Sequence, residues 1–186
     1  AQPLNWRLSE PEMARILGDG EPNLLIGSEE YAKLTGSLAT AANTPATLVF
    51  TSAADCDYEQ LIARSSDDEP KAAAKVTGDD PVLILYTGGT TGESKGALHS
   101  HHSLYMGMLN QSIAERIVPT DVYMLTGQMF HIPVALAMNY MAHGCPVVLI
   151  NFDAKLALDV IQKERVSAFL GITTMINWMM AVEDFQ

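Results

Sequence analysis

The sequence predicts an α/β fold with a mostly parallel sheet flanked by helices. Helix and strand patterns alternate along most of the 186 residues. The run Pro81–Tyr86 is continuously apolar and leads into glycines, which is typical of a strand covered on both faces. The composition is 48% hydrophobic and 18% charged, so the chain has enough apolar side chains for a buried core. A disordered chain is therefore excluded.

The first predicted helix begins with a capping box, because Ser9 is followed three residues later by Glu12. Glycines at positions 18 and 20 are expected to end this helix, since glycine favours helix termini over helix interiors. The apolar stripe of the helix consists of Met13, Ile16 and Leu17.

Strands and helices then alternate up to a polar stretch. The expected elements are a buried strand at 23–27, a helix at 29–38, a strand at 46–50 and a helix at 58–64. Residues 65–80 (SSDDEPKAAAKVTGDD) are polar and interrupted by turn residues, so they are expected to be a linker with at most one helical turn at 71–75. This linker is a candidate sub-boundary within the chain.

The pattern continues after the linker. The run 81–86 is expected to be a central parallel strand, and Asp153 is expected to cap a helix. The ten methionines fall at helical spacings and are expected to fill the core. Further helices are expected at 101–117, 132–143, 153–164 and 174–182, and further strands at 146–150 and 168–171.

The charge distribution excludes one class of partner. The chain has 11 basic and 22 acidic residues, a net charge of −11, so non-specific nucleic-acid binding is not expected. Up to residue 80 there are 14 acidic and 6 basic residues, and after it 8 acidic and 5 basic. The acidic run 67–69 is expected to be a solvated surface. The less acidic part of the chain is therefore the better place for an anion.

Cysteine usage and hydropathy bear on the location of the protein. Cys56 and Cys145 are too few for a disulfide scaffold and lack metal-ligand spacing, so both are expected to be reduced, partly buried thiols in a cytoplasmic protein. No apolar run reaches the length of about 20 residues that a membrane span needs. We therefore expect no membrane-spanning segment.

The segment TGGTTGESKG, Thr87 to Gly96, carries the most specific pattern in the chain. It follows a predicted strand and precedes a predicted helix, where α/β folds bind ligands. Its glycines, Gly88, Gly89 and Gly92, let the backbone approach an anion closely. Hydroxyl donors come from Thr87, Thr90, Thr91 and Ser94, and Lys95 supplies positive charge. The segment therefore predicts a phosphate-binding loop.

Two familiar phosphate motifs do not fit this segment. A Walker A loop needs glycine before its lysine and serine or threonine after it, whereas Ser94 precedes Lys95 and Gly96 follows it. The dinucleotide fingerprint Gly-x-Gly-x-x-Gly does not occur in the segment either. The structural alternative is a glycine-rich turn whose hydroxyls cap a helix.

The loop resembles the signature of the adenylate-forming (AMP-forming) superfamily of acyl-CoA ligases, luciferases and peptide-synthetase adenylation domains. That signature is roughly T-[SG]-G-T-T-G-x-x-K-G, and every fixed position matches. Gly88, where serine is commoner, is similar to the long-chain acyl-CoA ligase branch. Weaker similarities cover essentially the rest of the chain. They are PLNWRL at 3–8, Ser100–His101 after the loop, Met129–Ile132 as a variant of P-x-F-H, and 144–175 with Thr173 in place of the usual proline.

The resemblance implies a partial doubly wound N-terminal domain of an adenylate-forming enzyme. Such enzymes use ATP and Mg²⁺ to convert a carboxylic acid into an acyl-adenylate and pyrophosphate, and most then pass the acyl group to coenzyme A. By resemblance, residues 87–95 hold the β- and γ-phosphates. His131 matches a histidine near the acyl carboxylate, with helix capping as the alternative, and Thr173 lies where the family lines its acyl pocket. The expected substrate is a fatty acid or a related carboxylic acid.

Three further histidines are spaced like metal ligands but are not expected to bind one. His99, His101 and His102 lie where a helix is entered, so their side chains should point in different directions. His101 is expected to be structural. We predict no metal site formed by this chain.

Several family motifs are not found in these residues. They are the adenine-binding stretch, the Tyr-Gly-x-Thr-Glu motif, the ribose-binding aspartate, and the lysine of the small C-terminal lid domain. We therefore expect residues 1–186 to be a fragment of the large AMP-binding domain that is inactive alone. The alternatives are a fragment of an amino-acid-activating adenylation domain and a truncated, non-catalytic binding module. Exposed apolar edges would favour a homo-oligomer.

Overall fold

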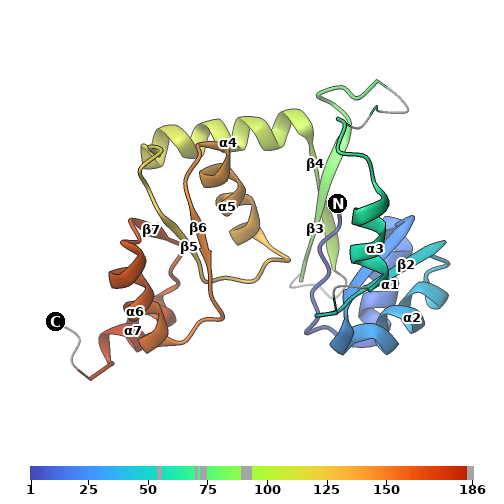
Figure 1. The fold of residues 1–186 in the computed structure, drawn as a ribbon, viewed down its shortest axis with the longest axis horizontal. Coiled ribbons are helices and arrows are strands. Elements are labelled where there is room, and N and C mark those ends of the chain that lie inside the picture. The colour runs from blue at the N-terminus through green and yellow to red at the C-terminus, as the bar shows by residue number, and fades with distance from the viewer. Residues whose placement is uncertain (54–55, 70, 72–74, 89–93, 184–186) are drawn as a thin grey trace. The chain divides into compact units, whose positions relative to one another are not determined.

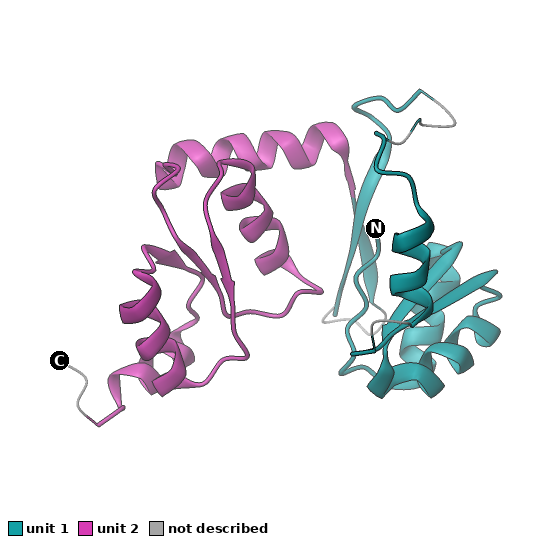
Figure 2. Ribbon diagram, viewed as in Figure 1, with its two compact units in different colours: residues 1–98 teal, residues 99–186 magenta. Residues whose placement is uncertain are grey.

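The computed structural model describes residues 1–53, 56–69, 71, 75–88 and 94–183. The chain forms two compact units, Ala1–Leu98 and His99–Gln186 (Figure 2). Each unit is described by itself below. The predicted turn at 71–75 lies largely outside the described residues.

The first unit packs helices against a short parallel sheet (Figure 1). Its strands β1 and β2 pair in parallel, from Leu24 opposite Ala46 to Ser28 opposite Phe50. The core of the unit is formed by Met13 and Leu17 of the first helix and Leu38 of the second. The elements are α1 (Glu10–Gly20), β1 (Leu24–Ser28), η1 (Glu29–Tyr31), α2 (Ala32–Ala41), β2 (Ala46–Phe50), α3 (Asp57–Arg64), β3 (Pro81–Thr87) and β4 (Lys95–Ser100), the last of which continues into the second unit.

Helix α1 confirms the predicted capping box and ends at Gly20, the second of the two glycines expected to end it. The backbone N–H of Ser9 donates to the Glu12 carboxylate at 2.8 Å. The helix continues through Gly18 and ends at Gly20, and Glu21 closes it in the left-handed conformation at φ 45°. Met13, Ile16 and Leu17 are buried, which stabilises the last turns despite the glycines.

The prediction of a buried strand at 23–27 is wrong for one face of β1. Leu25 packs into the core, whereas Leu24 and Ile26 are 42% and 52% exposed. Because side chains alternate along a strand, these two share the opposite face. An apolar run alone does not show whether one face of a strand or both are covered.

Strand β3 is not the central parallel strand that its sequence predicts. Among the described residues it pairs with β4, the next strand along the chain. The connection, residues 88–94, is too short for a parallel crossover, so the two strands run antiparallel. Two backbone hydrogen bonds also join β3 to Ala1, whose amino group donates to the Val82 carbonyl at 2.6 Å and whose carbonyl accepts from Ile84 N–H at 3.0 Å.

The second unit contains a three-stranded parallel sheet of order β6-β5-β7. Its middle strand was not predicted, because three residues are too few to show a period. The other predicted helices and strands match the observed ones within three residues at each end. The elements are α4 (His101–Glu115), β5 (Tyr123–Leu125), α5 (Ile132–Ala142), β6 (Val147–Leu149), α6 (Ala154–Glu164), β7 (Ala168–Phe169) and α7 (Thr173–Met180).

Both faces of β5 are covered. Tyr123 and Leu125 pack against Ala137 and Tyr140 of α5. Met124 points to the other face, where it clusters with Ala157 of α6 and Met179 of α7. Helices α4 and α5 therefore lie on one side of the sheet and α6 and α7 on the other, as a doubly wound α/β layer requires (Figure 1).

A polar network joins α4 to α5. Asn139 is 1% exposed, and its side-chain amide donates to the Met108 carbonyl and to Gln111 Oε1, each at 3.0 Å. The Tyr140 hydroxyl donates to Glu115 at 2.8 Å. Burial raises the pKa of Tyr140, and the Glu115 carboxylate raises it further. Because these buried groups are paired, the network fixes how the two helices pack.

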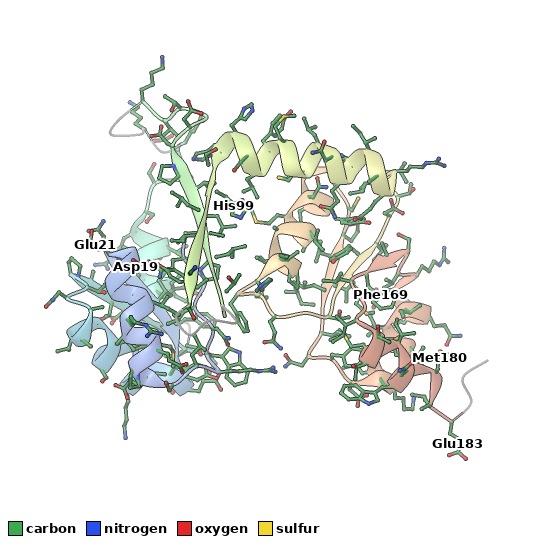
Figure 3. All side chains as sticks on the ribbon, turned by 180° about the vertical axis from the view of Figure 1, so that it is seen from behind. Asp19, Glu21, His99, Phe169, Met180 and Glu183 are labelled. Atoms are coloured by element: carbon green, nitrogen blue, oxygen red, sulfur yellow. The ribbon has the colours of Figure 1, made fainter. Side chains whose placement is uncertain are left out.

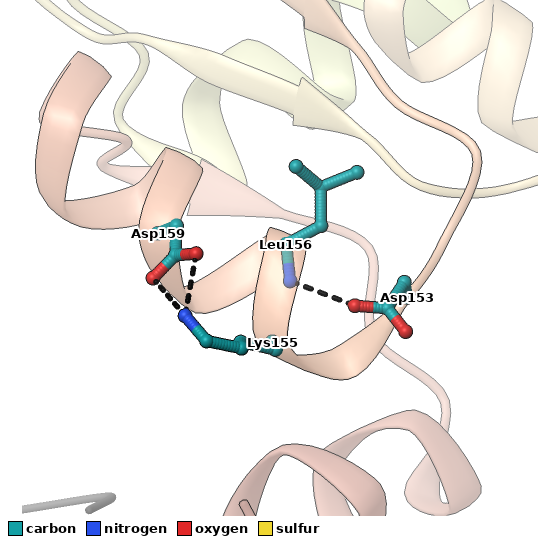
Figure 4. Close-up of polar contacts among 4 residues, drawn as sticks. All are labelled: Asp153, Lys155, Leu156 and Asp159. Carbon is teal, nitrogen blue, oxygen red and sulfur yellow. Dashed lines mark hydrogen bonds and ion pairs between the residues drawn. The ribbon is translucent and has the colours of Figure 1, made fainter.

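Helix α6 confirms the predicted cap. The Asp153 carboxylate accepts from the backbone N–H of Leu156 at 2.9 Å (Figure 4). Lys155, in the first turn, forms an ion pair with Asp159, one turn further along, at 2.8 Å. Both side chains of the pair are well exposed, so the cap stabilises the helix more than the pair does.

Asp121 fastens the loop before β5 to the start of β7. Its carboxylate accepts from the backbone N–H of Val118 at 2.8 Å and from the Ser167 hydroxyl at 2.7 Å. These bonds, the Val118 bond first, lower the pKa of Asp121 below its usual value. The stability that they provide therefore depends on the ionised carboxylate.

We predict that Asp121 stabilises the fold only while it is ionised. Its folded-state pKa lies below the unfolded value of about 3.9, so the contribution is complete above that value and is lost as the pH falls through the folded-state pKa. Asp121→Asn should lower stability at pH 7 by no more than about 1 kcal/mol, because the carboxylate is half exposed. Denaturation followed from pH 7 to pH 2 should show the difference from wild type shrinking. A constant difference would contradict the assignment, and Asp159→Asn controls for the loss of one charge.

Candidate functional site

Strands β3 and β4 form the stem of the predicted phosphate loop. Thr87 is the last residue of β3 and Lys95 the first residue of β4, so the antiparallel pair brings both ends of the motif to one end of the stem. Thr87, Gly88 and Lys95 are exposed, and Ser94 is half-buried. Residues Gly89, Thr90, Thr91 and Gly92 lie outside the described residues, so the predicted cradle itself stays a prediction.

Gly96 has a packing role that the motif did not reveal. A Cβ atom at this position would come within 2.7 Å of Ile84 Cδ1 and 3.1 Å of Tyr86 Cζ. Ile84 and Tyr86 are two residues apart on β3 and so share one face of the strand. A side chain at position 96 would therefore have to displace the side chains of Ile84 and Tyr86.

Tyr86, the residue before Thr87, is held by a distant contact. Its hydroxyl donates to the carboxylate of Asp19, 67 residues away near the end of α1. Burial, and then the hydrogen bond and negative charge of Asp19, raise the pKa of Tyr86 to about 12. The phenol therefore stays protonated at physiological pH. The sequence alone assigned no role to either residue, because nothing local connects them.

His131 caps helix α5. Its ring nitrogen Nδ1 accepts a hydrogen bond from the backbone N–H of Ile132 at 2.8 Å. Nδ1 is therefore unprotonated, and the hydrogen of the neutral ring is on Nε2. The structure thus shows the capping alternative for His131. The cap uses only Nδ1 and does not involve Nε2.

An apolar pocket of about 450 Å³ lies along α5, β5 and β6. Helix α5 contributes Val134, Ala137, Met138 and Met141, whose spacing places them on one helix face. Met129, two residues before His131, also lines the pocket. Met129, Met138 and Met141 are 54%, 47% and 62% exposed. The expectation that the methionines fill the core is wrong for these three and also for Met106 and Met180, which are 42% and 61% exposed. It is confirmed for Met13, Met124 and Met179, which are buried.

The three closely spaced histidines lie at the junction of β4 and α4. His99 is half-buried near the end of β4 (Figure 3), and His101 and His102 are exposed in the first turn of α4. Within the described residues, no group of three or more His, Cys, Asp or Glu side chains could hold a metal ion.

Both cysteines are free thiols, half-buried at Cys56 and buried at Cys145. Burial raises the pKa of Cys145, whose Sγ donates to the Val118 carbonyl at 3.2 Å. In the part of the chain that the structure describes, no helix combines the length and the apolar character needed to cross a bilayer.

Comparison with known proteins establishes the class to which this fold and motif belong. The family model described as "AMP-binding enzyme" matches residues 1–186, so the chain belongs to the family of AMP-binding enzymes. The resemblance inferred from TGGTTGESKG is thereby confirmed.

Among curated proteins, the chain is similar to two CoA ligases. It is 30% identical to the long-chain-fatty-acid–CoA ligase FadD13 of Mycobacterium tuberculosis, over 100% of this chain and 37% of that protein. It is also 30% identical to the indoleacetate–CoA ligase of Aromatoleum aromaticum, over 96% of this chain and 36% of that protein. The chain thus spans little more than a third of the length of these relatives.

Solved structures show the same fold. The inhibitor-bound N-terminal domain of FACL13 from Mycobacterium tuberculosis matches with a TM-score of 0.84 at 27% identity, over 98% of this chain and 46% of that one. ATP-bound MatB from Rhodopseudomonas palustris matches with a TM-score of 0.82 at 23% identity, over 97% and 36%. The predicted fold, part of the N-terminal domain of an adenylate-forming enzyme, is therefore confirmed.

We predict that Gly96→Ala destabilises the protein. The added methyl group must displace Ile84 and Tyr86, and overpacking of this kind costs about 1–3 kcal/mol. Gly36→Ala is the matched control, because Gly36 lies inside α2 with open space around its Cβ position. That change should stabilise the protein by up to about 1 kcal/mol. Thermal denaturation of the two variants should give shifts of opposite sign, and equal shifts would contradict the packing role of Gly96.

Proposed function

We propose that the chain is part of an ATP-dependent acid–thiol ligase that forms an acyl-adenylate and transfers the acyl group to coenzyme A. The observation that carries this proposal is the TGGTTGESKG segment, whose two ends are held together by the β3–β4 stem next to the exposed Lys95. Family membership supports it, and so do the names of the curated relatives, which are acid–CoA ligases.

The loop is proposed to bind the β- and γ-phosphates of ATP through Thr87, the loop backbone, Ser94 and Lys95. When the carboxylate of the substrate attacks the α-phosphorus, negative charge grows on the departing pyrophosphate. A fixed ammonium group and oriented N–H donors stabilise this charge without having to reorganise. The hydroxyl-rich segment and its single lysine fit a phosphate chain accompanied by Mg²⁺, which when bound neutralises part of the phosphate charge.

His131 is proposed to orient or polarise the acyl carboxylate and not to act as a base. In the neutral ring, the Nδ1 lone pair already accepts from Ile132, and Nε2 carries the hydrogen. The one ring lone pair is therefore already used, and taking a proton there would break the helix cap. Nε2–H can still donate to a carboxylate oxygen, which is the role that this geometry supports.

The substrate is proposed to be a carboxylic acid with an apolar body, such as a fatty acid. The pocket on α5 supports this, because its lining is apolar and rich in methionines, which adapt to ligands of different shape. The names of the relatives include both a fatty acid and indoleacetate as acids. Together with ATP and coenzyme A, which the family uses, this acid completes the set of proposed small-molecule partners.

Residues 1–186 are proposed to be a catalytically incomplete part of the large AMP-binding domain. The share of the curated relatives that the chain spans, 37% and 36%, supports this. We likewise propose a sub-boundary at 65–80, a lid domain that is not part of residues 1–186, and a homo-oligomeric state. The free thiols are in keeping with the proposed cytoplasmic location.

We predict that pyrophosphate with Mg²⁺ raises the melting temperature of the wild-type chain and that Lys95→Ala abolishes the shift. Ligand at 100 times its Kd stabilises a protein by about 2.7 kcal/mol, which corresponds to several degrees for a chain of this size. Lys163→Ala, which removes a charge from the exposed side of α6, is the matched control and should keep the shift. Equal shifts in wild type and Lys95→Ala would overturn the role of Lys95. No shift in wild type would count against phosphate binding by this chain.

A further inference from the structure

Tyr86 contacts both ends of the motif that we propose to bind phosphate. It directly precedes Thr87, so its backbone leads into the loop. Its ring also lies against Gly96 of β4, at the place where a Cβ atom would come within 3.1 Å of Tyr86 Cζ. Gly96 directly follows Lys95. The position of this one ring is therefore coupled to the residues on both sides of the loop.

The hydroxyl of the same ring reaches a third element. It donates to the Asp19 carboxylate in the last turn of α1. Asp19 lies beside Glu21 at that end of the helix (Figure 3). Tyr86 is thus held from two sides, by Gly96 against its ring and by Asp19 at its hydroxyl.

Helix α1, which carries Asp19, is anchored in the first unit by buried side chains. Met13, Ile16 and Leu17 are each at most 3% exposed. The side chain of Gln2 donates to the Ile16 carbonyl at 3.0 Å and occupies the space beside Gly20, where a Cβ would come within 2.2 Å of Gln2 Oε1. The neighbouring Ala1 is hydrogen-bonded to β3. The end of α1 is therefore joined to β3 independently of Tyr86.

Asp19 is not placed where it would favour its own helix. The C-terminal end of a helix carries partial negative charge, so a carboxylate there is unfavourable. The last turn of α1 has no basic residue to offset it. The Tyr86 hydroxyl donates a hydrogen bond to this carboxylate. A residue that is locally unfavourable and paired over a long distance is typical of a functional position.

We propose that Tyr86 and Asp19 are positioning residues for phosphate binding, which hold the two ends of the loop so that Thr87 and Lys95 face the same phosphate chain. This inference rests on the proposed function. Neither residue touches the phosphates, and both act through the β3–β4 stem. The contact costs nothing to form when the ligand binds, because α1 and β3 hold it in place beforehand.

The test measures the affinity of the chain for pyrophosphate with Mg²⁺ by calorimetry, together with the melting temperature. Tyr86→Phe removes only the hydroxyl and should weaken binding by about three- to tenfold, the worth of an ordinary intramolecular hydrogen bond, because this one is exposed to solvent. Asp19→Ala should weaken it equally. The double variant should be no weaker than either single one, because both remove the same bond. Asp19→Asn retains an acceptor oxygen and should keep most of the affinity.

A matched control separates this role from a general loss of stability. Tyr58→Phe removes the hydroxyl of another half-buried tyrosine in the same unit and should leave the affinity unchanged. If Tyr86→Phe and Asp19→Ala lower the melting temperature but not the affinity, the positioning role is overturned.

The same measurements distinguish the two proposals. If Lys95→Ala loses binding while Tyr86→Phe and Asp19→Ala retain it, the phosphate loop stands and the positioning role falls. If the wild-type chain does not bind pyrophosphate, the proposed phosphate loop fails and the positioning role fails with it.

Discussion

In the second unit helices cover both faces of a parallel sheet, and this covering shapes the unit. Strand β5 has only three residues, but all are buried, with Tyr123 and Leu125 packed on one helix layer and Met124 on the other. Each helix must return the chain to the same edge of the sheet. As a result, the segments after β5, β6 and β7 all leave from the carboxyl edge. The Thr126 hydroxyl, which donates to the Leu170 carbonyl at 2.7 Å, joins two of them there. The segment that contains His131 therefore leaves from the edge where such folds bind ligands.

The proposed phosphate loop follows different rules, because its stem is an antiparallel pair and not a strand followed by a helix. Its geometry is set by side chains that pack across the pair. Gly96 leaves room for Ile84 and Tyr86, and Tyr86 in turn reaches α1 through Asp19. The final glycine of the motif thus has a steric reason that is separate from anion binding. A motif that is recognised by its phosphate chemistry can thus also contain residues, here Gly96, that are required for side-chain packing.

Features set by neighbouring residues could be predicted from the sequence. The capping box of α1, the Asp153 cap and the strand at 46–50 depend on local patterns, and each occurs where those patterns indicate. Strand β5 is too short to show a period, and β4 (KGALHS) lacks a regular apolar alternation. The contacts of Tyr86 with Asp19 and of Asn139 with Gln111 join distant residues, and no sequence pattern reports them. For the same reason the apolar run 81–86 predicts a central parallel strand although β3 pairs with β4, since an apolar run does not reveal its neighbours.

The central claim is that residues 87–95 bind phosphate. The most direct test is to follow the backbone amide resonances of the chain by NMR while pyrophosphate and Mg²⁺ are added. The account predicts that the largest changes fall on the amides of 87–95 and on their stem neighbours in β3 and β4. Changes concentrated elsewhere, for example at the start of α5, or no saturable changes at all, would contradict it.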